Sequence, residues 1–163
     1  MFKTKEIVNI ALIAAIAFVL SLFVVFRMPQ GGSITLYLLP LFFVAFNDSL
    51  KVNVFVALVT ATLQVLLGGY VINPIQVILD YYLPVMFICT SQVFKMNKYV
   101  NLSIGSLLAM MSYVISGMVF FEVPFIPSII YNATFFIPTI IINLILFMMV
   151  NPRLARIYNK EAQ

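Results

Sequence analysis

The sequence contains no histidine and no tryptophan, only one cysteine, and few charged residues. Without histidine, it lacks the commonest general base and metal ligand of proteins. The single cysteine, Cys89, excludes a disulfide within the chain and a metal site built from cysteines. The sequence shows no glycine-rich phosphate-binding loop with a lysine, no nucleophile with a neighbouring base and no metal-binding cluster. We therefore expect no catalysis, no cofactor and no metal.

The scarcity of charge indicates a membrane protein. Charged residues make up 9% of the 163 residues and hydrophobic residues 64%, whereas soluble domains usually carry about 25% charged residues. A helix needs roughly 20 apolar residues to cross a bilayer, so the length allows about six spans with short loops. No Lys/Arg stripe lies along a helix, which argues against nucleic-acid binding. The composition predicts an all-α integral membrane protein, with residues 1–163 forming a single transmembrane domain.

Six apolar stretches are predicted to form the transmembrane helices. They cover residues 7–26, 34–46, 52–67, 74–94, 100–121 and 128–150. Polar, Gly-rich or Pro-containing segments separate them, and Pro152 is expected to end the last apolar run. The first stretch follows two lysines and has no small-residue cleavage site at its end. It is therefore interpreted as a transmembrane helix rather than a removable signal peptide.

The basic residues are distributed unevenly between the two sides of this six-span topology. Lys and Arg in short loops mark the cytoplasmic side of a membrane protein. Only Arg27 lies on one side, and eight basic residues lie on the side of the two termini. This asymmetry predicts that both termini are cytoplasmic. The eight are Lys3, Lys5, Lys51, Lys95, Lys98, Arg153, Arg156 and Lys160.

Polar residues from four regions of the chain are expected to meet in the outer half of the membrane. Asp80 is the most informative, because an ionisable residue inside a span costs about 2.5 kcal/mol or more. Gln76 shares its helix face, and Tyr70 lies in the preceding loop. A carboxylate beside aromatic rings suits a cationic or amine-bearing aromatic ligand. The alternative is that Asp80 is a structural partner of Arg27 or of a backbone amide.

Charged residues at the ends of spans allow two interpretations. Arg27 and Glu122 can belong to a ligand site, or they can simply extend toward water, as such side chains commonly do. Phe121 and Tyr131 lie near Glu122 in the sequence. They either line the site or form part of an interfacial aromatic belt.

Ala11 and Ala15 place two small residues on one face of the first predicted helix. Faces of this kind let transmembrane helices approach closely. The pattern fits packing within the chain, and it equally fits docking of another membrane subunit.

With these residues in view, the chain resembles the substrate-binding (S) components of energy-coupling factor (ECF) vitamin transporters. It is most similar to the thiamine-specific ones. The likeness covers nearly the whole chain in the number and spacing of its spans, and four stretches carry it. They are Ala11-xxx-Ala15; Gly31-Gly32-Ser33-Ile34-Thr35 followed by Pro40; Tyr70 followed by Pro74-Ile-Gln76-Val-Ile-Leu-Asp80-Tyr81; and Ser116-Gly117 with Tyr131.

The resemblance implies a six-helix S component in the plasma membrane of a bacterium. Such a protein would bind thiamine, or a related cationic aromatic vitamin or precursor, at its outer face. The implied partners are an ECF transmembrane coupling subunit, docked through Ala11 and Ala15, and two ATPase subunits. The loop at residues 30–33 would close over the site, and Phe121 stands where the family has a tryptophan. The implied substrate-binding residues are Ser33, Tyr70, Gln76, Asp80, Gly117, Phe121, Glu122 and Tyr131.

Other functions stay open on the sequence. The chain can be an S component for a different vitamin, a ligand-free membrane assembly protein, or a small stand-alone transporter. Stand-alone transporters often show repeats or a polar path through both membrane halves. Here the inner half holds Asp48 and Lys51 at a turn and little else, which argues against a stand-alone transporter.

Overall fold

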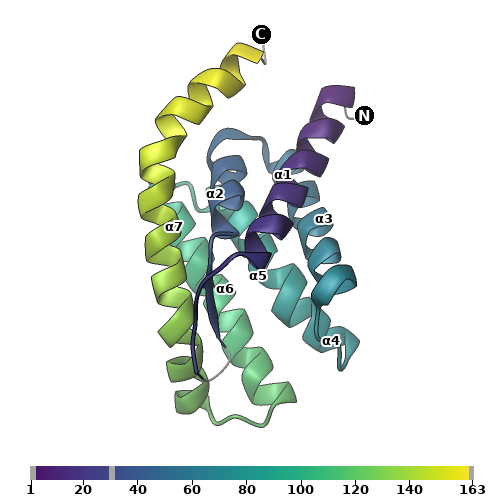
Figure 1. Ribbon diagram of the computed structural model, residues 1–163, viewed down its shortest axis with the longest axis vertical. Coiled ribbons are helices and arrows are strands. Elements are labelled where there is room, and N and C mark those ends of the chain that lie inside the picture. The colour runs from purple at the N-terminus through teal and green to yellow at the C-terminus, as the bar shows by residue number, and fades with distance from the viewer. Residues whose placement is uncertain (1–2, 30–31, 162–163) are drawn as a thin grey trace.

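Helices make up most of the structure, a computed structural model that describes residues 3–29 and 32–161, with side chains as far as Leu154. They run along one bundle whose two chain ends lie together at one end (Figure 1). The long helices are α1 (Thr4–Leu22), α3 (Leu50–Gly68), α6 (Lys98–Phe120) and α7 (Phe125–Glu161). The shorter elements are the strands β1 (Val24–Arg27) and β2 (Ser33–Thr35) and the helices α2 (Leu38–Asn47), α4 (Pro74–Val77), η1 (Ile78–Tyr82), α5 (Leu83–Cys89) and η2 (Ser91–Phe94).

Four helices of the described chain are long and apolar enough to cross a membrane. They are α1, α3, α6 and the Phe125–Leu154 part of α7. Two further apolar helical segments, Leu38–Asn47 and Pro74–Cys89, are shorter. These helices confirm the prediction of a helical protein whose segments are long and apolar enough to cross a membrane.

A two-stranded sheet corrects the bounds of the first two predicted helices in a protein that is otherwise helical. Strand β1 pairs antiparallel with β2, with Val24 opposite Thr35 and Arg27 opposite Ser33. The first helix therefore ends at Leu22, and the second begins at Leu38 rather than at residue 34. Apolarity alone suited a helix through residue 26, but valine and phenylalanine also favour strands. Proline and glycine in the following residues favour a turn.

The last helix is longer than its predicted span of residues 128–150. It begins at Phe125 and continues through Pro152 to Glu161. Proline removes one backbone hydrogen bond from a helix interior, and here the helix continues despite that loss. At 1.5 Å per residue, its 37 residues extend roughly 55 Å, which is more than the thickness of a bilayer core.

Helix α2 lies at the centre, where it contacts α1, α3, α5, α6 and α7. Its Leu38, Leu41 and Phe42 are fully buried. At the end near the chain termini, Asn47 donates to Asn151 Oδ1 at 2.9 Å, linking α2 to α7. The hairpin β1–β2 and the connection between α6 and α7 lie toward the opposite end (Figure 1).

Candidate ligand-binding site

A cavity of about 930 Å³ lies toward the end of the bundle opposite the chain termini. This volume is within the range of small-molecule binding sites. Its walls come from the ends of α1 and α3, the hairpin, η1, α6 and the beginning of α7. The lining residues are Phe18, Ser21, Leu22, Gly32, Ser33, Thr35, Tyr37, Gln64, Gly68, Asp80, Tyr81, Tyr113, Gly117, Phe121, Val123, Pro127, Ser128, Tyr131, Asn132, Phe135, Phe136 and Thr139.

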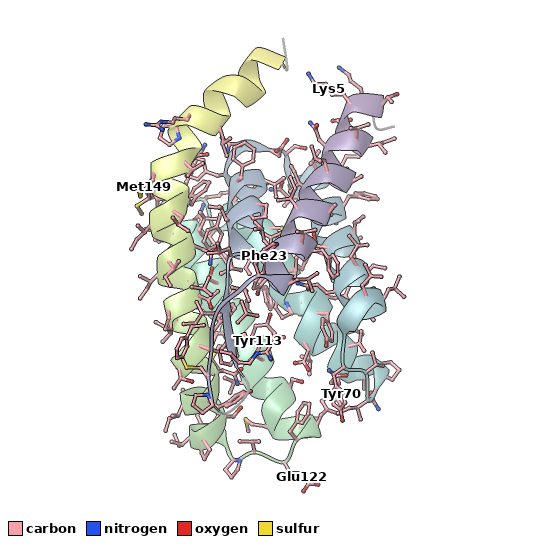
Figure 2. All side chains as sticks on the ribbon, viewed as in Figure 1. Lys5, Phe23, Tyr70, Tyr113, Glu122 and Met149 are labelled. Carbon is pink, nitrogen blue, oxygen red and sulfur yellow. The ribbon has the colours of Figure 1, made fainter. Side chains whose placement is uncertain are left out.

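The cavity brings together most of the residues that the sequence singled out. Five of the eight expected binding residues line it: Ser33, Asp80, Gly117, Phe121 and Tyr131. The other three, Tyr70, Gln76 and Glu122, do not appear among its lining residues. Figure 2 shows Tyr70 and Glu122 at the end of the bundle away from Lys5, with Tyr113 further inside.

An irregular turn in the fourth predicted span carries Asp80. The Leu83 N–H donates to the Ile78 carbonyl, as in a π-helix, instead of to Leu79. The Leu79 carbonyl accepts from Ser112 Oγ on α6 at 2.6 Å. Pro84 follows and has no N–H for the Asp80 carbonyl. The widened turn thus has a specific cause, and π-turns of this kind are frequent at functional sites.

The Asp80 carboxylate is partly buried, and one close partner lies among the residues that the structure describes. Its Oδ2 accepts from Gln76 Nε2 at 2.6 Å. Arg27, the alternative partner that the sequence left open, is exposed on β1. Within the part of the chain that the structure describes, we find no ion pair to Asp80. A carboxylate that faces a large cavity and has no ion-pair partner of its own can offset the charge of a cationic ligand.

Three residues at four-residue spacing form the α6 wall of the cavity. Tyr113, Gly117 and Phe121 all line it. A Cβ at Gly117 would lie 2.6 Å from Ser128 Oγ, and this hydroxyl donates to the Val114 carbonyl at 3.0 Å. Glycine therefore allows α7 to pack closely against α6 beside the cavity.

Sequence reasoning missed a pair of tyrosines in the cavity wall. The hydroxyls of Tyr37 and Tyr113 are 3.2 Å apart, and the Tyr113 ring meets Phe136 edge-on at 5.2 Å between centroids. Tyr113 lies one helical turn before Gly117, so the helical period could have identified it. Tyr37 follows a hairpin that the sequence did not reveal, so no comparable signal existed for it.

The rim of the cavity carries Tyr70 and Glu122. Tyr70 is exposed, with its ring 6.4 Å from that of Phe121. Glu122 is also exposed and has a positive φ of 53°; its side chain points away from the bundle (Figure 2). Because its neighbours Phe121 and Val123 line the cavity, Glu122 lies just outside the site.

The hairpin forms part of the cavity wall and packs against α7. A Cβ at Gly32 would overlap the ring of Phe135, and both residues line the cavity. Asn143 Nδ2 donates to the Thr35 carbonyl at 2.8 Å, which ties the base of the hairpin to α7. Gln30 and Gly31, which belong to the loop expected to close the site, lie outside the described residues.

Replacing Gly32 by alanine is expected to weaken ligand retention. The added methyl group cannot fit against Phe135 without moving either the hairpin or that ring. We expect ligand dissociation to become about tenfold faster, a loss of about 1.4 kcal/mol. Stopped-flow or filter-binding dissociation kinetics measure this change. Leu107→Ala is the control, because Leu107 is exposed on α6 and does not line the cavity. Equal dissociation rates for both variants would contradict a closing role for the hairpin.

The comparison with known proteins agrees with this geometry. The sequence model of the family described as thiamine transporter protein matches residues 7–159. The chain belongs to the thiamine transporter family. This confirms the family resemblance drawn from the sequence, and it makes the chain a member of a family of transporters.

Two relatives show how far the likeness extends. The thiamine transporter ThiT of Bacillus subtilis (strain 168) is 30% identical to this chain over 180 residues, covering 93% of this chain and 94% of that protein. A solved structure of ThiT from Listeria monocytogenes superimposes with a TM-score of 0.78 at 22% identity. It covers 91% of this chain and 94% of that one. At this identity, the second likeness supports the fold alone.

Proposed function

We propose that this chain is the thiamine-binding S component of an ECF-type importer, with residues 1–163 forming one substrate-binding domain. The observation that carries the proposal is the Asp80 carboxylate, which faces a cavity of about 930 Å³ lined by aromatic rings. Membership of the thiamine transporter family supports the same ligand. The protein binds its ligand and performs no catalysis.

The chemistry of thiamine fits the composition of this cavity. Thiamine carries a permanently charged thiazolium ring and a neutral aminopyrimidine ring. Asp80 offsets the positive charge, and the faces of Phe121 and Tyr131 provide cation–π and stacking contacts. Ser33 and the Tyr37–Tyr113 hydroxyl pair provide hydrogen-bonding groups for the polar edge of the ligand.

Gly117, Tyr70 and Glu122 have supporting roles in the proposed binding of thiamine. Close packing at Gly117 shapes the α6 wall. Tyr70 covers the rim beside Phe121. The exposed carboxylate of Glu122 attracts the cation as it approaches, an effect that acts mainly on the association rate.

The proposed topology has six spans. The two shorter apolar segments complete the four long helices: α2 crosses together with the extended residues of β2, and Pro74–Cys89 crosses together with η2. An even number of spans places both termini on one side. The basic residues predict that this side is cytoplasmic, and the cavity then opens outward.

Thiol labelling of intact cells is expected to leave both ends of the chain unmodified. Cysteines introduced as Phe2→Cys or Lys160→Cys, in a Cys89→Ala background, should react with a membrane-impermeant maleimide only after permeabilisation. Glu122→Cys, in the connection between α6 and α7, is the outward-facing control and should react in intact cells, because Glu122 is exposed and its side chain points away from the bundle. Labelling of either terminus from outside would contradict the topology.

The proposed docking face for the coupling subunit is the outer side of α1. Ala11 and Ala15 are exposed, whereas Ala14 and Ala17 are fully buried in the bundle. The exposure of Ala11 and Ala15 supports a contact with a partner outside this chain. Small residues on a free face allow close approach of a partner helix, and two ATPase subunits bound to that partner would supply the energy.

Vesicles separate this function from that of a stand-alone transporter. Vesicles that contain this chain alone should bind thiamine without accumulating it. Accumulation in them would contradict the S-component assignment.

Mass spectrometry of small molecules that co-purify with the protein tests the identity of the ligand. Thiamine or a related cation supports the proposal, and a neutral or anionic vitamin would indicate an S component of different specificity.

A further inference from the structure

Gln76 is buried next to Asp80 and lies outside the lining of the cavity. Its exposed fraction is 0%, and it does not appear among the cavity-lining residues. Its Nε2 donates to Asp80 Oδ2 at 2.6 Å and to the Tyr70 carbonyl at 3.1 Å. Its Oε1 accepts from the Ile72 N–H at 3.2 Å. Both ends of the amide are therefore engaged within the protein, and neither is left for a ligand.

These bonds join the carboxylate to the loop at residues 69–73, which connects α3 to α4. Tyr81, which lines the cavity, fastens the same loop, because its hydroxyl accepts from the Tyr70 N–H at 2.7 Å. The ring of Tyr70 in turn lies beside Phe121, which lines the cavity from the other side of the rim. The chain of contacts thus runs from Asp80 through Gln76 and the loop to Phe121.

We propose that Gln76 is a positioning residue. Its hydrogen bonds connect the Asp80 carboxylate to the loop at residues 69–73, so that the carboxylate and the loop move together as one unit. Gln76 holds one carboxylate oxygen and leaves the other for the cationic ligand. A ligand bound at Asp80 fixes this unit, and the fixed loop keeps Tyr70 against Phe121 and slows release. The inference rests on the proposed function, since it requires that Asp80 binds the ligand.

The physical basis is the cost of leaving buried polar groups without partners. If the loop moves away, the Gln76 amide loses its bonds to Tyr70 and Ile72 at a fully buried position. Opening of the rim is therefore opposed by the same amide that orients Asp80. Gln76 never contacts the ligand and acts only through these two neighbours.

Thiamine-binding kinetics of Gln76→Met test this role, because methionine keeps the length and volume of glutamine and removes its hydrogen bonds. We expect dissociation to become at least tenfold faster, with the association rate changed less than threefold. Gln76→Glu keeps the acceptor for Ile72 but loses the donor, and it should release thiamine faster as well. Gln92→Met, which changes the same side chain far from the cavity on η2, is the matched control and should behave as the wild type.

The loop itself supplies a readout that a general loss of packing would not produce. Spin labels are attached at Val71→Cys in the loop and Val119→Cys on α6, in a Cys89→Ala background. Pulsed electron paramagnetic resonance then measures the distance between the two labels across the rim. Thiamine should narrow this distance distribution in the wild type and in Gln92→Met. It should fail to narrow the distribution in Gln76→Met. Equal narrowing in Gln76→Met would overturn the proposal.

A double-mutant cycle separates failure of this inference from failure of the proposed function. The effects of Gln76→Met and Asp80→Asn on affinity should be strongly non-additive, because Gln76 acts through Asp80. Losses that multiply would show that Gln76 acts independently, which overturns the inference. A normal dissociation rate in Gln76→Met beside weak binding in Asp80→Asn would also overturn it, while leaving the proposed function intact. If the wild type does not bind thiamine, the proposed function fails first.

Discussion

Asp80→Asn is expected to weaken thiamine binding by roughly 2–5 kcal/mol, the cost of removing one member of a desolvated charge pair. Asparagine keeps the shape of the side chain and removes the charge that faces the cavity. Asp80→Glu keeps the charge and should lose less affinity. Isothermal titration of the purified variants measures both effects, and unchanged affinity in Asp80→Asn would remove Asp80 from the site.

Two controls make this result specific. Glu122→Gln removes the same charge from a carboxylate that lies outside the cavity, and it should change mainly the association rate and its dependence on salt. Arg27→Gln tests the alternative in which Asp80 has a structural role. If Asp80 and Arg27 formed an essential pair, Asp80→Asn and Arg27→Gln would both lower the melting temperature in the absence of ligand. We expect neither to do so.

Ala11→Trp and Ala15→Trp are expected to abolish thiamine uptake by cells that contain the complete importer. Bulk on the exposed face of α1 prevents close approach of a partner helix, and without that partner the bound ligand is not moved inward. Binding to the purified variants should stay at the wild-type level, because the two side chains lie outside the cavity and point away from the bundle core.

Leu107→Trp is the matched control for added bulk on a membrane-facing surface. Leu107 is exposed on α6, so the substitution adds a comparable side chain away from α1, and uptake should persist. If Ala11→Trp and Ala15→Trp lowered binding as much as uptake, the alanines would serve the fold of this chain. The docking proposal would then fail.

Much of the site could be predicted because its residues follow helical periods inside apolar spans. Asp80 was apparent because a carboxylate is costly there. The family resemblance added Gly117 and favoured a binding role for Phe121 and Tyr131, which the sequence had already singled out. The helical spacing also explains why Tyr113, one turn before Gly117, was within reach of the same argument.

The remainder depends on contacts between segments that lie far apart in the sequence. Apolar residues 23–26 suit a strand as well as a helix, and the pairing of Arg27 with Ser33 decides between them. Gln76 looked like a ligand contact because it shares a helix face with Asp80. Its position next to the carboxylate and outside the cavity lining follows from the hydrogen bonds that it makes to the loop at residues 69–73. The sequence pattern around Gln76 does not predict these bonds.

Titration of the purified, detergent-solubilised wild-type protein with thiamine tests the central claim most directly. The proposed function predicts saturable binding to one site per chain, with competition by other cationic thiamine analogues. Affinity in the nanomolar range would correspond to about −12 kcal/mol. The absence of any saturable binding by a folded, monodisperse preparation would contradict the assignment of the cavity as a thiamine site.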